Sequence, residues 1–199
     1  MQKKHVPSIS PRYWIALSIA SVFGVNMGDF FAKVLGMGHV RGLPILAVLL
    51  IATLLIERRG KHAHEGYYWF AIIVIRTGAT NLADFAAGDM KWEKGWVMLG
   101  LAAILVGIVL LGRRLVSVPV HAAERIDDTG LPSTDAYFWT CMLVAGTLGT
   151  VAGDYLSFGS GMGLQTATIV LSVLLAAWLY LARGLLRVVG YYWFSIVFV

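Results

Sequence analysis

Long apolar runs constrain this chain more than any other feature. Six runs approach the ~20 residues that cross a bilayer as an α-helix, and a seventh starts near the end of the sequence. Only 14% of the residues are charged, whereas a soluble domain carries roughly a quarter. We therefore expect an all-α polytopic membrane protein whose main partner is the lipid bilayer. The apolar runs are 13–31, 40–56, 67–87, 95–112, 136–158, 164–182 and 188–199.

Basic residues indicate the orientation, because loops rich in Lys and Arg remain in the cytoplasm. Eleven Lys and Arg residues fall on one side of the predicted spans and four on the other, with Arg76 alone inside a span. This distribution predicts a cytoplasmic N-terminus. Since the formal charge of +5 is explained by these loops, we expect no nucleic-acid partner.

An internal repeat organises the spans. An aromatic residue followed by tryptophan occurs four times, at Tyr13-Trp14, Tyr68-Trp69, Phe138-Trp139 and Tyr192-Trp193. Fifteen residues after each of the first three tryptophans stands an aspartate, and the three are Asp29, Asp84 and Asp154. Each aspartate follows a small residue and precedes an aromatic one. No other acidic residue lies within a predicted span.

This unit predicts a helical hairpin. Each copy starts at its aromatic-Trp pair on the cytoplasmic side, carries its aspartate near the outer end, turns, and returns through a plainer span. Gly-Met-Gly follows the aspartate at 36–38 and 161–163, whereas the second copy has Lys91-Trp92-Glu93 and should turn differently. Two spans per copy give every copy the same orientation, so the repeats are parallel, around an axis along the membrane normal.

The predicted fold is a transmembrane helical bundle of three full hairpins plus one unfinished span. A fourth aspartate would stand at position 208, so we expect a truncated fourth repeat, with a second copy of the chain or another membrane subunit covering the missing quarter. The predicted segments are a cytoplasmic N-terminal segment at 1–12, repeat 1 at 13–56, a cytoplasmic loop at 57–66, repeat 2 at 67–112, a cytoplasmic linker at 113–135, repeat 3 at 136–187 and the start of repeat 4 at 188–199.

The pattern resembles a family of bacterial integral membrane proteins built from tandem repeats of unknown function, each with two transmembrane helices and a shared tryptophan. The resemblance rests on the small-Asp-aromatic triplets and on Trp14, Trp69, Trp139 and Trp193. It implies a multi-pass protein of the bacterial inner (plasma) membrane. Because it implies no activity, function has to be inferred from the residues.

Small residues line one face of each span that carries an aspartate. They stand one and five positions before it, four apart, and such pairs let two helices approach closely in lipid. The predicted packing residues are Gly24, Gly28, Ala79, Ala83, Gly149 and Gly153. The four tryptophans at the span starts are expected to anchor the helices at the membrane interface.

A polar stripe runs beside the small one. It includes Thr77 and Thr147, and its carboxylate, amide and hydroxyl oxygens suit hard cations and protons. Since an ionised aspartate is costly in lipid, the stripe should face the bundle interior or a water-filled cavity. The predicted ion-binding residues are Asp29, Asp84, Asp154, Asn26, Asn81, Thr80 and Thr150. The sequence does not identify a metal, and it predicts no cofactor.

These residues favour a small transporter or channel-like protein that moves a cation, either a divalent metal ion or a proton-coupled solute. The alternative is a non-transporting membrane scaffold or subunit in which the aspartates pair with Arg76, Lys33 or other repeats. Arg76 and Asp84 are eight residues apart, about 12 Å along a helix, too far for direct pairing. His39 is expected to be a surface residue, and the tract at 61–65 a solvated turn.

We expect no enzyme and no catalytic residue. The sequence contains no phosphate-binding glycine loop, no HExxH and no GxSxG. An intramembrane aspartyl-type hydrolase is a remote alternative. It would need two dissimilar aspartates acting as an acid–base pair, whereas this chain uses one motif three times.

Overall fold

The computed structural model describes residues 7, 9–59, 65–115, 134–181 and 189–199, and these residues contain helices and no strand. The predicted tract at 61–65 and the linker at 113–135 lie largely outside the described residues. The helices are α1 (Pro11–Asp29), α2 (Gly38–Arg41), α3 (Leu43–Arg59), α4 (Glu65–Asp84), α5 (Lys94–Leu115), α6 (Ala136–Asp154), α7 (Leu164–Leu181) and α8 (Val189–Phe198), with π-helical segments η1 (Phe30–Val34), η2 (Phe85–Asp89) and η3 (Tyr155–Gly159).

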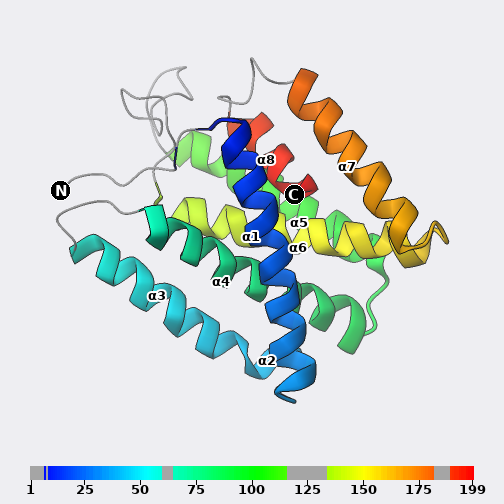
Figure 1. Cartoon of the computed structure of the whole chain (residues 1–199), viewed down its shortest axis with the longest axis horizontal. Coiled ribbons are helices and arrows are strands. Elements are labelled where there is room, and N and C mark those ends of the chain that lie inside the picture. The colour runs from blue at the N-terminus through cyan, green and yellow to red at the C-terminus, as the bar shows by residue number, and fades with distance from the viewer. Residues whose placement is uncertain (1–6, 8, 60–64, 116–133, 182–188) are drawn as a thin grey trace.

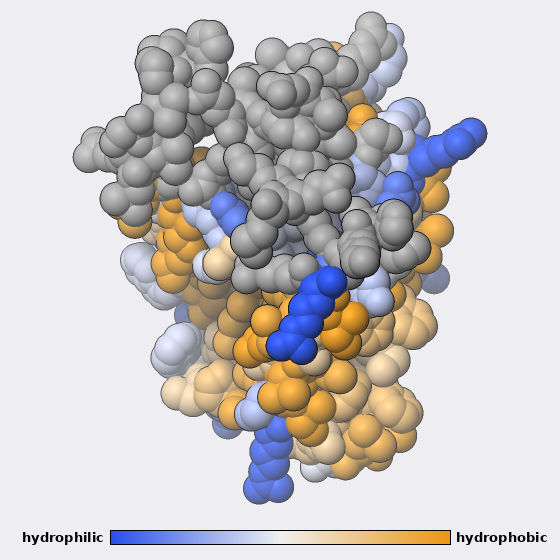
Figure 2. Space-filling view, turned by 90° about the vertical axis from the view of Figure 1, so that its left-hand side faces the viewer, coloured by the Kyte–Doolittle hydropathy of each residue, from blue (hydrophilic) through white to orange (hydrophobic). Residues whose placement is uncertain are grey.

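Six helical segments have the length and composition of membrane spans, and they coincide with the six complete apolar runs. They are Pro11–Val34, Gly38–Glu57, Glu65–Asp89, Lys94–Leu111, Ala136–Gly159 and Leu164–Leu181. The lower part of the face in Figure 2 is largely apolar, as expected of side chains that contact lipid tails. The chain is therefore a multi-pass helical membrane protein, and α8 occupies the seventh apolar run.

The four helices that contain an aromatic-Trp pair form the centre of the bundle, and we call α1, α4, α6 and α8 the inner helices. α4 packs against α1 and α6, and α6 also packs against α8. The other long helices, α3, α5 and α7, are the return helices. In Figure 1, α3 and α7 lie along opposite edges of the bundle.

Each return helix packs against the inner helix of the next repeat. α3 packs on α4, α5 on α6, and α7 on α8, although α7 also contacts α6 of its own repeat. The predicted hairpin is therefore an open one, whose second arm reaches across to the following copy. Successive repeats are linked by helix packing as well as by the chain.

Four aromatic side chains form a closed layer at the end of the inner bundle where α1 begins, which we call the aromatic end. Ring centroids are 6.4 Å apart for Tyr13 and Tyr68, 6.2 Å for Tyr68 and Phe138, and 6.3 Å for Phe138 and Tyr192. The Tyr13 hydroxyl lies 2.8 Å from that of Tyr68 and 2.7 Å from that of Tyr192. These hydrogen bonds join the first inner helix to the last.

The neighbouring tryptophans repeat the same order around the axis. Trp69 packs on Tyr13, Trp139 on Tyr68, Trp193 on Phe138, and Trp14 on Tyr192, with centroid distances of 5.7, 5.9, 5.4 and 6.1 Å. Each indole therefore contacts the aromatic residue of the preceding repeat, and the last contact closes the ring. Three of the four tryptophans are buried, so their observed role is packing between inner helices. Their predicted role as interface anchors stays a prediction.

One turn further along the inner helices lies an aliphatic layer. It consists of the residues three positions after each tryptophan, all of which are fully buried: Leu17, Ile72, Met142 and Ile196. The inner helices are thus close-packed around a pseudo-fourfold axis near the aromatic end. At this end the ring is completed by α8 of the same chain. A second copy or another membrane subunit stays a prediction.

The small residues of the repeat face the next inner helix. A Cβ atom at Gly24 would lie 2.5 Å from the Cβ of Arg76, and one at Gly28 would lie 3.2 Å from the Cβ of Thr80. Ala79 is buried against Gly146, and Gly149 approaches the carbonyl oxygen of Val197. Ala83 is also buried, whereas a Cβ atom at Gly153 would meet no described neighbour within 4 Å. Close helix approach is therefore observed at four of the six predicted packing residues, Gly24, Gly28, Ala79 and Gly149.

The same turn follows all three aspartates. A π-helical segment begins at the next residue, and its wider turn is closed by hydrogen bonds from Leu35 N to Phe30 O (3.0 Å), Met90 N to Phe85 O (2.9 Å) and Ser160 N to Tyr155 O (2.9 Å). Seven residues after each aspartate the backbone enters the left-handed region, at Gly36, Lys91 and Gly161. The second turn thus keeps the first left-handed position despite its missing Gly-Met-Gly, and it places Lys91 at φ 54°.

Replacing Lys91 by glycine should stabilise the protein by about 0.5–1 kcal/mol. Glycine removes a left-handed strain of about 1–2 kcal/mol and adds some backbone freedom to the unfolded chain. The measurement is the free energy of unfolding in mixed micelles. Gly161→Ala, the reverse change in the third repeat, should lower it by about 1 kcal/mol. Equal effects of the two substitutions would contradict the shared turn geometry.

Tyr13→Phe should lower the free energy of unfolding by about 1 kcal/mol, because it removes two hydrogen bonds worth roughly 0.6 kcal/mol each in helical membrane proteins. The rings remain packed, so no cavity is created. Tyr155→Phe is the matched control, since this tyrosine is exposed at the opposite end of an inner helix. An equal loss in both variants would show that the hydroxyl network at the aromatic end is not stabilising.

Candidate functional site

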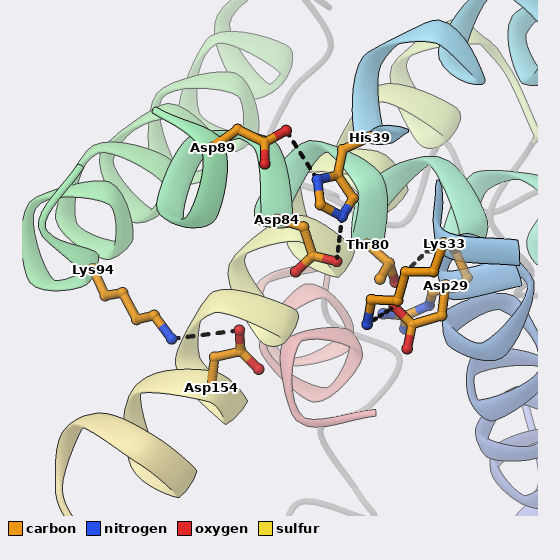
Figure 3. Close-up of polar contacts among 9 residues, drawn as sticks. Asp29, Lys33, His39, Thr80, Asp84, Asp89, Lys94 and Asp154 are labelled. Atoms are coloured by element: carbon orange, nitrogen blue, oxygen red, sulfur yellow. Dashed lines mark hydrogen bonds and ion pairs between the residues drawn. The ribbon is translucent and has the colours of Figure 1, made fainter. Parts of the chain in front are cut away.

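The three repeated aspartates lie at the end of the inner bundle opposite the aromatic layer, which we call the aspartate end. Asp29, Asp84 and Asp154 are the last residues of α1, α4 and α6, and each immediately precedes a π-helical segment. Each carboxylate therefore stands at the junction between an inner helix and the π-helical segment that leads into the turn. Figure 3 shows the three junctions and the polar side chains around them.

Each of the second and third aspartates contacts a basic side chain from the preceding repeat. His39 stands ten residues after Asp29, and its Nε2 lies 3.8 Å from Oδ2 of Asp84. Lys94 stands ten residues after Asp84, and its Nζ lies 3.5 Å from Oδ2 of Asp154. The same register therefore links one turn to the next inner helix twice. We call these two contacts the inter-repeat pairs.

Asp29, in the first copy, contacts a residue of its own turn. Its Oδ1 lies 2.8 Å from Nζ of Lys33, and both side chains are largely exposed. This pair joins positions four apart on one segment and does not link two repeats. The three aspartates therefore share a register in the sequence, but their surroundings differ.

His39 is not the surface residue expected from the sequence. Only 19% of its side chain is exposed, and it lies between two carboxylates, with Nδ1 2.9 Å from Oδ2 of Asp89 and Nε2 facing Asp84. The prediction was wrong because His39 lies on the short helix α2, which follows the left-handed turn and packs against α4.

The predicted threonine ligands bond to their own helices. The hydroxyls of Thr77, Thr80, Thr147 and Thr150 each donate to the carbonyl oxygen four residues earlier, at 2.9, 3.1, 2.9 and 3.1 Å. Asn26 is exposed, and its Nδ2 donates to the carbonyl oxygen of Val22 at 2.7 Å. The described residues include no group of three His, Cys, Asp or Glu side chains that could hold a metal ion. The cation site built from all seven residues stays a prediction.

Asn81 differs from the other polar residues of the stripe. It is fully buried, and neither its Oδ1 nor its Nδ2 has a hydrogen-bond partner. A Cβ atom at Gly28 would lie 3.3 Å from Oδ1, and one at Gly42 would lie 3.6 Å from Nδ2. The amide is therefore enclosed between α1 and the segment that joins α2 to α3.

Arg76 is a functional candidate that reasoning from the acidic residues missed. It is 5% exposed in the middle of α4, its Nη2 donates to the carbonyl oxygen of Ile196 at 3.1 Å, and its Nε has no partner. The proposed pairing with aspartates is not observed, since Asp29 and Asp154 contact Lys33 and Lys94. The available signal was its position as a lone basic residue inside a span, because such residues mark functional sites in membranes.

The polar interior of the inner helices is concentrated toward the aspartate end. Ser21 and Arg76 stand seven residues after their tryptophans, and the other buried polar side chains on α1, α4 and α6 come later in the same helices. The half toward the aromatic end is aliphatic and aromatic, apart from Ser195 on α8 and the hydrogen-bonded tyrosine hydroxyls. The later buried polar residues are Thr77, Thr80, Asn81 and Thr147.

The inter-repeat pairs should couple repeats energetically. Lys94→Asp and Asp154→Lys should each destabilise the protein, and combining them should restore part of the loss, with a coupling of about 0.5–1 kcal/mol for a partly exposed pair. The control is the Lys33→Asp, Asp29→Lys combination, which leaves the contacts between repeats unchanged. The free energies of unfolding of the four single and two double variants give the cycles. Zero coupling for Lys94 and Asp154 would contradict a linking role.

Comparison with known proteins agrees with the repeat seen in the sequence and in the fold. The family described as Repeat of Unknown Function (DUF347) matches residues 12–62 and 137–184. These two stretches contain the first and third hairpins, whose turns both carry Gly-Met-Gly. No curated protein and no solved structure matches the chain. With two copies of the repeat matched and the same register present in the second hairpin, the chain belongs to the family defined by this membrane repeat of unknown function.

Proposed function

We propose that the protein is a small membrane transport protein whose solute passes through the inner helices. The observation that carries this proposal is the buried, incompletely paired Arg76, together with the unpartnered polar atoms of Asn81 and Ser21. A buried polar group without a partner costs roughly 1–3 kcal/mol, and a charged group costs more. An inner bundle that served only to hold helices together would be more stable with apolar residues there.

The arrangement of these groups supports a path that opens toward the aspartate end. Polar side chains extend from the aspartates to the level of Arg76, and beyond it the aliphatic and aromatic layers close the bundle. Such a half-polar interior suits a protein that exposes its solute site to one side of the membrane at a time. The aromatic end would then open in a second conformation.

Of the cations that the sequence allows, the proton fits the geometry better than a metal ion. The three carboxylates contact three different basic side chains, and the described residues include no group of three His, Cys, Asp or Glu side chains that could hold a metal ion. Protonation of Asp84 or Asp154 would weaken an inter-repeat pair at the mouth of the path. We therefore propose that proton binding at these pairs is coupled to passage of the solute.

A scaffold is the second candidate, and the inter-repeat pairs favour it. Two of the three aspartates join one repeat to the next, which is the structural role that a scaffold requires. In that case Asp84→Asn would lower stability without changing any flux. Asp84→Asn therefore distinguishes the two candidates, because it should change flux in a transport protein and stability in a scaffold.

Proteoliposomes that enclose a pH-sensitive dye distinguish the two candidates. Proton entry is measured while single ions from a panel of potassium, manganese, nitrate and formate are added outside. A transport protein should show ion-dependent proton entry above empty liposomes, and Asp84→Asn should reduce it at least tenfold while the protein stays folded. Asp29→Asn, the same change outside the inter-repeat pairs, should leave the rate within twofold. Wild-type rates equal to those of empty liposomes would support the scaffold.

We also propose that the protein lies in a bacterial inner membrane with its N-terminus in the cytoplasm, as the distribution of Lys and Arg suggests. Single cysteines at Lys61 and Lys91, in a Cys141→Ala background, test this orientation. A membrane-impermeant maleimide added to intact cells should label position 91 and leave position 61 unlabelled until the cells are broken. Labelling of both positions in intact cells would contradict the two-span repeat.

A further inference from the structure

The charge of Arg76 has no carboxylate to balance it among the described residues. A guanidinium group stays protonated in proteins, so this charge persists inside the bundle. Tyr13, Tyr68 and Tyr192 are buried in the inner helices, but a phenol is uncharged at neutral pH. The three repeated aspartates contact other basic side chains.

Two buried donors on α1 and α4 have no acceptor among the described residues. Nε of Arg76 is buried without a partner, and so is the hydroxyl of Ser21 on the neighbouring helix. Ser21 lies one turn before Gly24, the residue whose face packs against Arg76. Nη2 donates to the carbonyl oxygen of Ile196 in the last turn of α8, and such a carbonyl offsets only part of a full charge.

The surrounding helices hold the arginine side chain in one place. A Cβ atom at Gly146 on α6 would lie 3.2 Å from Nη1, and one at Gly24 on α1 would lie 2.5 Å from the Cβ of Arg76. Ser21 in the first repeat and Gly146 in the third stand seven residues after the tryptophan of their repeat, as Arg76 does in the second. Three repeats thus provide one large cationic side chain and two small residues, and the small residues leave room for the large one near the axis.

We infer that Arg76 and Ser21 form a binding site for a small monovalent anion at the centre of the inner helices. The ligand class is a halide, nitrate or short carboxylate that accepts hydrogen bonds from Nε and the serine hydroxyl. It is monovalent because the site offers a single positive charge. It is small because the adjoining side chains, including Leu17, Ile72 and Met142, are fully buried and close-packed.

The anion at Arg76 is also the solute of the proposed transport, and this role rests on the proposed function. An anion at Arg76 would be the species that passes, while the aspartates at the mouth bind the proton. The binding site itself is defined by Arg76 and Ser21 alone. It can therefore be tested by binding, without any measurement of flux.

Thermal unfolding in nanodiscs, followed by tryptophan fluorescence at constant pH and ionic strength, tests the site. The probes are sodium chloride, sodium nitrate and sodium formate, compared with sodium gluconate. At least one small anion should raise the Tm with a saturable dependence on its concentration, because a ligand that binds the folded state stabilises it. Arg76→Met should abolish this rise, and Ser21→Ala should weaken the apparent affinity at least threefold. Lys33→Met, which removes an exposed cation, should leave it unchanged.

The inference is overturned if none of the three anions raises the Tm above that in gluconate, or if Arg76→Met keeps the rise. If Arg76→Met does not fold, Arg76→Lys and Ser21→Ala decide, since an affinity unchanged in both variants also overturns it. Saturable binding without ion-dependent proton entry in liposomes would keep the site and remove the transport function. Ion-dependent proton entry without anion stabilisation would keep transport and remove the anion site.

Discussion

Contact between each repeat and the next is the constraint on which the rest of the structure depends. The tryptophan of each aromatic-Trp pair packs on the aromatic residue of the preceding copy around the ring, and every return helix packs on the inner helix of the following one. In lipid there is little hydrophobic drive between helices, so close packing and polar contacts must hold them together. A single hairpin of this kind has few internal contacts, and its helices become a bundle only when neighbouring copies are present.

The interior combines this tight packing with polar groups that packing alone does not explain. Near the aromatic end, the four inner helices present equivalent side chains at each level, and the layers are filled. Toward the aspartate end, the equivalence is lost: Asn81 is buried where the first repeat has the exposed Asn26 and the third has the buried Val151. The inner helix of the second repeat carries four of the seven buried polar residues found on the inner helices, and it is the most buried of the candidate membrane spans. Departure from the repeat pattern is therefore concentrated in the copy that is best shielded from lipid.

The helices could be predicted from the sequence, because the length of an apolar run and the spacing of the Trp-to-Asp unit depend on local pattern. The packing face at Gly24 and Gly28 could also be predicted, since small residues four apart permit close approach. The partners of the aspartates could not be predicted from the sequence, because the contact from His39 to Asp84 depends on the turn that brings α2 against α4. Arg76 was visible as a lone charge in a span, but its partner in α8 depends on how four helices close around an axis.

The hydrogen bond between Tyr13 and Tyr192 has a consequence for the making of the protein. The two residues are 179 positions apart in the chain, although their hydroxyls are neighbours in the finished bundle. At the usual 5–20 residues per second, roughly 10–35 s separate the synthesis of the first tyrosine from that of the second. During that interval the first helix has one neighbour on the ring and a bare flank against lipid. Closure of the ring therefore has to wait for α8, and no earlier stage of translation can complete it.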